Sequence, residues 1–253
     1  MTRTQLLVII PTYNERKNLL PLVNSVQDAL STTDILIVDD NSPDGTGDIA
    51  TERASRDTKV HVLHRSKKDG LGRAYIAGFR WALQHHYSHI FQIDADFSHD
   101  PATLPNLLEA TTNHDVALGS RWMRGGGTQG WPYHRKILSQ TANLYARVVL
   151  RTNIRDLTGG YKCLRRRVLE TIDLNGVTSI GYGFQIEITW LAKQHGFTVV
   201  EVPIIFSERT AGKSKLSGST LLEAVYLVWQ LRNNRIMTVR PSGPLPDSHS
   251  DHT

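Results

Sequence analysis

The sequence of 253 residues contains a single cysteine, Cys163, and no long apolar run. One cysteine excludes an internal disulfide and suits a reducing compartment, where such a residue is most often simply buried. A membrane-spanning helix needs roughly 18 or more apolar residues, and no stretch approaches that length. The run Leu6–Ile10 is also too short for a signal-peptide core. The sequence therefore predicts a soluble or peripheral protein.

Acidic residues are fewer than basic ones, 24 against 29, which gives a formal net charge of +5. This charge favours acidic partners, and phosphate groups, an anionic membrane surface and nucleic acid all satisfy it. The length fits one large α/β domain, which we place at residues 1–240. Residues 241–253 are rich in Pro, Ser, Asp and His, and we expect a disordered tail there.

Short β-branched runs alternate with helical patterns through the first half. We expect strands at Leu6–Ile10, Ile35–Asp39, Val60–His64, Ile90–Asp94 and Val116–Gly119. Helices are expected at Glu15–Leu30, Thr46–Arg56, Gly72–His86 and Pro101–Asn113. The second half predicts helices at Tyr133–Leu150, Gly183–His195 and Ser219–Arg235, and a strand at Thr198–Ile205. This alternation indicates a mostly parallel sheet with helices on both faces, which binds ligands at the carboxyl ends of its strands.

Two aspartates with one residue between them end the fourth predicted strand, in "FQIDADFSHDP". In an extended chain residues i and i+2 point to the same face, so Asp94 and Asp96 are expected to project together. Two close carboxylates repel unless a cation lies between them or one keeps its proton. Hard oxygen ligands favour Mg²⁺ or Mn²⁺. A turn-capping aspartate beside a solvated one is the alternative.

Asp39 and Asp40 end the second predicted strand. An acid at this point can accept hydrogen bonds from ribose hydroxyls or base N–H groups, as in dinucleotide-binding folds. The following Asn-Ser-Pro-Asp-Gly is also strong turn chemistry, and both roles can hold at once.

Basic residues form two groups along the second half of the chain. Arginine and lysine match phosphate oxygens, so two groups suggest two phosphate-bearing substrates, although each residue alone reads equally as a solvated surface charge. The groups are Arg121, Arg124, Arg135 and Lys136, and Arg209, Lys213 and Lys215.

Two nucleotide-binding motifs fail on inspection. The Gly-x-Gly at Gly70 and Gly72 follows the third strand, and Tyr75 stands where a dehydrogenase fingerprint needs its third glycine. The Gly-Lys-Ser of a P-loop occurs late in the chain, with Ser207 in place of the first glycine. Neither a dehydrogenase nor an ATPase is indicated.

Six segments, in order along the chain, resemble the polyprenol-phosphate and dolichol-phosphate mannose synthases. They are "IIPTYNERKNL", "IVDDNSPDGT", "GLGRAYIAGF", "DADFSHDP", "GSRW" and "FSERTAGKSKLSG", which together span roughly residues 6–220. The resemblance implies an inverting glycosyltransferase of the GT-A fold. It implies transfer of mannose from GDP-mannose to a polyprenyl or dolichyl phosphate, with Mg²⁺ or Mn²⁺ as cofactor.

The resemblance also implies roles for individual residues. Guanosine would be held by Pro11, Tyr13, Glu15, Asp39 and Asp40. Asp94 and Asp96 would bind the metal and the donor diphosphate. The acceptor phosphate would meet Arg121, Arg135 and Ser139, and a mobile loop would bring Arg209 and Lys215. Gln185 and Glu187 match a segment near the acceptor.

The chain departs from some relatives in two respects. Ser98 stands where some have Gln, so water would replace a third side-chain ligand to the metal. C-terminal transmembrane helices, which many relatives carry, do not appear. We therefore expect a peripheral protein on the cytoplasmic face of the membrane with a separate membrane-anchoring partner. The apolar residues of the last predicted helix are read either as core or as a membrane-docking face.

Three other functions compete with mannosyl transfer. The nearest is a sister enzyme that moves glucose from a UDP-sugar onto the same lipid. A non-catalytic nucleotide-sugar sensor would bind donor but gain nothing from the paired aspartates and the basic loop together. A nucleic-acid binder would explain the charge, but paired acids at the cleft oppose docking of a phosphate backbone.

Overall fold

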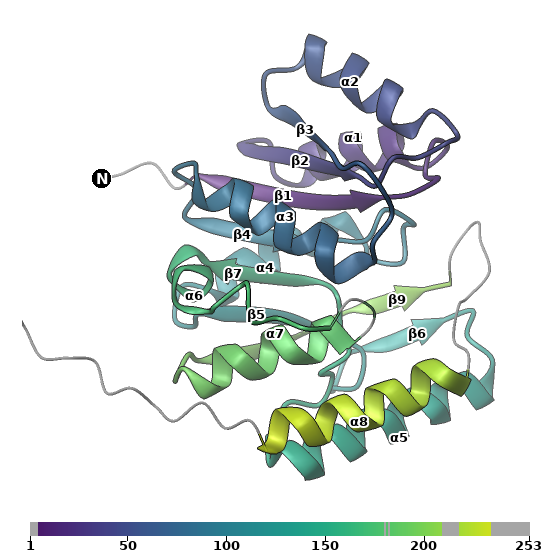
Figure 1. The fold of residues 1–253 in the computed structure, drawn as a ribbon, viewed down its shortest axis with the longest axis vertical. Helices are drawn as coiled ribbons and strands as arrows, with labels where there is room; N and C mark the ends of the chain where they lie inside the picture. The colour runs from purple at the N-terminus through teal and green to yellow at the C-terminus, as the bar shows by residue number, and fades with distance from the viewer. Residues whose placement is uncertain (1–4, 180, 182, 209–217, 234–253) are drawn as a thin grey trace, which may run out of the picture.

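The computed structural model describes residues 5–179, 181, 183–208 and 218–233, and a seven-stranded sheet of order β3-β2-β1-β4-β7-β5-β8 lies at its centre (Figure 1). The strands are β1 (Leu6–Thr12), β2 (Thr33–Asp39), β3 (Val60–His64), β4 (His89–Gln92), β5 (Val116–Ser120), β7 (Lys162–Arg165) and β8 (Val199–Pro203). Neighbours pair in parallel except β7, which is antiparallel to β4 and β5. The predicted α/β, mostly parallel sheet is confirmed.

Helices cover both faces of this sheet because its strands are apolar on both sides. In β1, Leu7 and Ile9 join one buried cluster while Val8 and Ile10 join another, as the two-residue period of a strand requires. The first cluster includes side chains of α3 (Leu71–Leu83), α6 (Arg166–Thr171) and α7 (Gly183–Gln194). The second includes side chains of α1 (Leu19–Ala29), α2 (Thr46–Arg56) and α4 (Leu104–Ala110).

A helix pair lies at one end of the molecule, beyond β5 and β8. Figure 1 shows α8 (Gly218–Asn233) lying along α5 (Tyr133–Leu150). A third apolar cluster joins them to α7 through Ala146, Trp190 and Val228. A small parallel pair of strands, β6 (Gly127–Gln129) and β9 (Ile205–Ser207), lies nearby. Within the described ranges no helix has the length and apolar character needed to span a membrane.

Several predicted boundaries were wrong. The first helix starts at Leu19 instead of Glu15, because residues 15–18 form a turn in which Glu15 accepts from the backbone N–H of Asn18. The segment Pro101–Asn113 contains a short 3-10 helix, η1 (Pro101–Thr103), followed by α4, and ends at Ala110. The third helix ends at Leu83, before His86. The predicted tail at 241–253 lies outside the described residues.

The largest error concerns the second half of the sheet. β7 was not predicted, because its four residues, Lys-Cys-Leu-Arg, begin and end with a charged residue and lead directly into α6. The single strand expected at Thr198–Ile205 is two strands, β8 and β9, which belong to different sheets. Both differences come from long-range pairing that a local pattern does not contain.

Candidate active site

Polar side chains gather where the parallel strands end. β1, β2, β4 and β5 all run in the same direction, so the loops that follow them open at one edge of the sheet. At that edge Thr12 of β1 lies opposite Asp39 of β2 in the strand register. The edge carries the aspartates predicted for the donor and, after β5, Arg121.

Asp39 organises the loop that follows it. Its Oδ1 accepts from the hydroxyls of Thr12 (3.0 Å) and Ser42 (2.6 Å), and its Oδ2 accepts from the backbone N–H of Ser42 (3.1 Å). A carboxylate has about four acceptor positions, so one remains for a ligand. The turn role predicted for this segment is therefore present, and a ribose contact is still possible beside it.

Asp40 and Tyr13 each have a basic partner. Asp40 accepts a hydrogen bond from Arg65, and burial raises the pKa of its carboxyl despite that neighbour. The ammonium of Lys68 lies 3.6 Å from the centre of the Tyr13 ring. The side chain of Glu15 accepts from Asn18 at 2.8 Å. Four of the five residues predicted to hold guanosine, Tyr13, Glu15, Asp39 and Asp40, thus follow β1 or end β2, and Pro11 lies in β1 itself.

The geometry predicted for Asp94 and Asp96 was wrong. β4 ends at Gln92, and Asp96 lies in a turn before Phe97, whose φ of 59° is in the left-handed region. The two carboxylates are therefore not on one face of a strand. Asp96 is buried and accepts from the backbone N–H of Ser98 at 3.0 Å.

Asp94 is more exposed and is held by two buried aromatic side chains. The hydroxyl of Tyr75 donates to Asp94 Oδ1 at 3.3 Å, and burial together with the charge of Asp94 raises the pKa of Tyr75. His99 Nδ1 accepts from the backbone N–H of Asp94 at 3.4 Å. Burial lowers the pKa of His99, which favours the neutral ring that such an acceptor needs.

The oxygen atoms of this loop fit a divalent cation that takes further ligands from its substrate. The Ser98 hydroxyl is buried without a hydrogen-bond partner among the described residues, next to the two aspartates. The same residues contain no group of three or more His, Cys, Asp or Glu side chains arranged to hold a metal. Two carboxylates leave positions for water and phosphate oxygens, which is how Mg²⁺ is usually bound.

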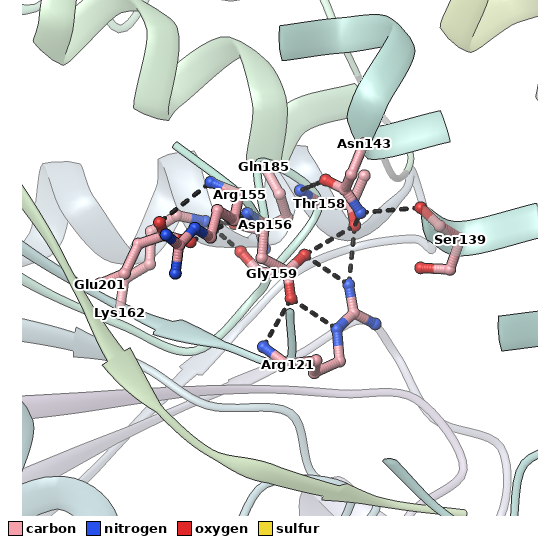
Figure 2. Close-up of polar contacts among 10 residues, drawn as sticks. All are labelled: Arg121, Ser139, Asn143, Arg155, Asp156, Thr158, Gly159, Lys162, Gln185 and Glu201. Carbon is pink, nitrogen blue, oxygen red and sulfur yellow. Dashed lines mark hydrogen bonds and ion pairs between the residues drawn. The ribbon is translucent and has the colours of Figure 1, made fainter. Parts of the chain in front are cut away.

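Arg121, predicted to meet the acceptor phosphate, follows β5 and is held by Asp156. Its Nε and Nη2 donate to the two oxygens of Asp156, each at 2.7 Å, and Nη2 also donates to Thr158 at 2.7 Å (Figure 2). The glycines after it permit a close turn, since a Cβ at Gly126 would lie 2.5 Å from the carbonyl oxygen of Ser120.

Arg135 and Ser139, the other residues predicted for the acceptor, lie on α5. The guanidinium of Arg135 lies 3.9 Å from the ring centre of Trp131, and its Nη1 is 3.5 Å from Glu208. The Ser139 carbonyl accepts from the Asn143 side chain at 3.0 Å. The sequence did not indicate Asp156, Thr158 or Asn143, and the only local signal is an acid and a threonine beside two glycines. Arg209 and Lys215 lie outside the described residues.

Glu187 has a structural role instead of the acceptor contact predicted for it. Its Oε1 accepts from the backbone N–H of Thr178 at 3.1 Å and its Oε2 from that of Ser179 at 2.8 Å. Gln185 is buried, and its Oε1 accepts from Lys162 of β7. Lys162 is fully buried and also donates to the carbonyl of Gly159 at 2.5 Å.

Lys162 gives the protein a predicted pH dependence of stability. Burial lowers its pKa from 10.5 to about 7, against the attraction of Asp156 and Asp94. Below pH 7 the ammonium is charged in both states and its burial destabilises the fold. Above pH 7 the folded state loses the proton first, so this penalty shrinks. Relative to Lys162→Met, the wild-type free energy of unfolding is expected to rise between about pH 6 and pH 9. Urea denaturation at both values tests this, and a pH-independent difference contradicts it.

The sequence matches the model of glycosyl transferase family 2 over residues 7–173. The chain belongs to glycosyltransferase family 2. A polyprenol monophosphomannose synthase of Mycolicibacterium smegmatis is 53% identical over 230 residues, which cover 89% of this chain and 87% of that protein. An undecaprenyl-phosphate mannosyltransferase of Micrococcus luteus is 49% identical over 221 residues, covering 87% and 91%. The predicted resemblance is confirmed, and the protein is a glycosyltransferase.

Solved structures share the fold. Glucosyl-3-phosphoglycerate synthase of Mycobacterium tuberculosis, in complex with Mn²⁺, UDP and glucosyl-3-phosphoglycerate, superposes with a TM-score of 0.67 over 92% of this chain and 81% of that one, at 16% identity. A mannosyltransferase of Pyrobaculum calidifontis, in complex with GDP-Man and Mn²⁺, gives a TM-score of 0.57 over 92% and 74%, at 15% identity. At these identities the likeness concerns the fold alone.

Proposed function

We propose that this glycosyltransferase moves mannose from GDP-mannose to a polyprenyl monophosphate, giving polyprenyl phosphate mannose and GDP with inversion at the sugar. The observation that carries the proposal is the 53% identity, along nearly the whole of both chains, to a polyprenol monophosphomannose synthase. A neighbour of the same fold that binds GDP-Man with Mn²⁺ supports the donor and the metal. The rival donor is UDP-glucose, which the neighbours that bind UDP keep in view.

In this proposal the donor lies along the edge formed by β2, β1 and β4. Asp94 and Asp96 would hold Mg²⁺ or Mn²⁺, which when bound stabilises the negative charge that develops on the diphosphate. The guanosine would lie on the loops after β1 and β2. Its contacts would come from Pro11, Tyr13, Glu15, Asp39 and Asp40. Arg209 and Lys215 would close over the phosphates and add preorganised positive charge.

The acceptor would supply its own nucleophile. A phosphate monoester has its second pKa near ~6, so a phosphate oxygen is already anionic at neutral pH. A hydroxyl acceptor would instead need a side chain to take its proton. Arg121, Arg135 and Ser139 would bind and orient this phosphate, so the reaction needs positioning more than it needs a general base.

The donor assignment is tested by comparing two labelled donors. The purified protein is incubated with a polyprenyl phosphate and Mg²⁺ or Mn²⁺, and with either GDP-mannose or UDP-glucose, and label is counted in the organic phase. Transfer from GDP-mannose alone, inhibited by GDP more strongly than by UDP, is the expected result. Transfer from UDP-glucose alone would assign the chain to the sister activity. Binding of a donor without transfer from either would indicate a sensor.

The α5–α8 pair offers a face for the membrane that holds such an acceptor. On α5, Leu144 is 57% and Val148 67% exposed, and on α8, Tyr226 is 66% and Trp229 51% exposed. Large apolar side chains gathered on one exposed face often mark an interaction site, and a lipid-modifying enzyme has the bilayer as its natural partner. A separate membrane-anchoring protein, proposed from the family resemblance, would dock at this end as well.

Charge placed on this face is expected to weaken membrane binding. The double variant Leu144→Glu, Val148→Glu should sediment with anionic vesicles at least about tenfold less than wild type, because two carboxylates oppose insertion among the headgroups. Glu52→Lys on α2, which lies in the nucleoside half of the sheet, is the control and should sediment normally. Equal sedimentation of the double variant and the wild type would move the membrane contact elsewhere.

A further inference from the structure

Arg121 has an unusual arrangement of donors for a residue proposed to bind phosphate. A guanidinium carries five N–H donors. Three of them are taken, by the two oxygens of Asp156 and the hydroxyl of Thr158. The two N–H groups of Nη1 donate to no described residue. Only one edge of the guanidinium is therefore left for a ligand.

Asp156 is itself held rigidly. It is fully buried. A carboxylate of Glu201 on β8 accepts from the backbone N–H groups of Arg155 and Asp156, both at 3.0 Å. Burial alone would raise the pKa of Asp156, but Arg121 and its hydrogen bonds hold that pKa below its ordinary value, so the carboxyl stays ionised. The backbone N–H of Arg121 also donates to Asp156, at 2.9 Å.

The same network reaches α5. Thr158 donates to Asp156 at 3.1 Å and accepts from the side chain of Asn143 at 3.0 Å. Asn143 Oδ1 accepts from the backbone N–H of Thr158 at 3.2 Å, and its Nδ2 reaches the Ser139 carbonyl. Figure 2 shows this path running from Arg121 through Thr158 and Asn143 to Ser139. Two elements that carry proposed acceptor residues are thus joined by buried hydrogen bonds.

We infer that Asp156 is a positioning residue for the acceptor phosphate: it fixes Arg121 so that the Nη1 edge alone is presented to the phosphate. The inference rests on the proposed function, which places the phosphate at Arg121. Because Asp156 balances the charge of Arg121, the guanidinium acts mainly as a directional donor. Net positive charge for the phosphate then comes from other residues, Arg135 among them. A support of this kind preorganises a binding group that would otherwise rotate.

Asp156→Asn tests the inference, because the amide group presents N–H donors to a guanidinium that is itself only a donor. Arg121 then turns away from its bound position. We expect kcat/KM for the polyprenyl phosphate to fall about a hundredfold, mainly through a higher KM. Binding of GDP, measured by calorimetry, should change less than about twofold, since the nucleoside loops do not contact Asp156.

Asp115→Asn is the matched control. Asp115 is also buried, and it pairs with Arg167 and accepts from the hydroxyl (2.9 Å) and the backbone N–H (3.0 Å) of Thr198, away from the proposed acceptor site. It should lower the melting temperature as Asp156→Asn does but leave the acceptor KM unchanged. Thr158→Val, which removes one neutral bond to Arg121, serves if Asp156→Asn does not fold, and should raise the acceptor KM about threefold to tenfold.

The outcomes separate the two claims. If the wild type transfers mannose to polyprenyl phosphate and the acceptor KM of Asp156→Asn, or of Thr158→Val where only that variant folds, stays at the wild-type value, the inference is wrong and the proposed function stands. The same holds if Asp115→Asn raises the acceptor KM equally, because the effect would then be one of stability. If the wild type does not transfer to polyprenyl phosphate at all, the proposed function fails and takes the inference with it.

Discussion

Asp96→Ala is expected to reduce sugar transfer at least about a hundredfold, because even supporting residues around a bound metal contribute factors of 10 to 100. Asp96 is buried and its Oδ1 is held by the backbone of Ser98, so its carboxylate is fixed before any cation arrives. The loss should appear in kcat and in the Mn²⁺ dependence of GDP binding. Initial rates over a Mn²⁺ titration measure the first effect, and calorimetry with and without Mn²⁺ measures the second.

Asp100 provides the control in the same loop. It is exposed and caps η1, accepting from the backbone N–H of Ala102 at 2.9 Å. Asp100→Ala should cost about 1 kcal/mol of stability, as a lost helix cap does, and leave the Mn²⁺ response intact. If Asp96→Ala kept the wild-type Mn²⁺ dependence, the metal would be held by other residues and the proposed role of the aspartate pair would be wrong.

Arg121→Met is expected to lower the free energy of unfolding by about 3–5 kcal/mol, because it leaves a buried carboxylate without its cation. Asp156 is fully buried and Arg121 only 8% exposed, so water replaces little of the lost interaction. Urea denaturation at neutral pH measures the effect. The double variant Arg121→Met, Asp156→Leu should recover most of the loss, since replacing both members of a buried pair by apolar residues is often nearly neutral.

The pair also fixes the sign of an acid effect. The pKa of Asp156 is lowered in the folded state, so its contribution is present above the unfolded pKa and is lost as the pH falls through the folded one. The stability gap between wild type and Arg121→Met should therefore narrow in acid. A gap below about 1 kcal/mol at neutral pH, the range of an exposed pair, would mean that Asp156 is solvated.

Local pattern was sufficient to predict much of the fold. α2, β3 and α5 have the predicted bounds, because each is a periodic segment with clear ends. β7 could not be predicted, since a strand that places a buried lysine beside Gln185 depends on packing from α7. The end of β4 at Gln92 was missed for a related reason: the extended pattern continues, but the partner strand β7 stops pairing there.

The candidate site was predicted unevenly. Acids at strand ends are visible in the sequence, because parallel strands must bring them to one edge. Their supports are not visible, because Asp156 is 35 positions from Arg121 and Tyr75 is 19 from Asp94. Periodicity carries no information about such pairs. Glu187 shows the converse error, since a polar residue in a motif supports the backbone of Thr178 and Ser179.

The central claim is that the acceptor nucleophile is a lipid phosphate. The most direct test gives the enzyme GDP-mannose, Mg²⁺ or Mn²⁺, and either a polyprenyl phosphate or the corresponding polyprenol, and measures mannosyl lipid from each. Product from the phosphate alone, in the β configuration expected of inversion, is the predicted result. Equal product from the alcohol would contradict the account, because the site would then have to supply a base that this mechanism does not need.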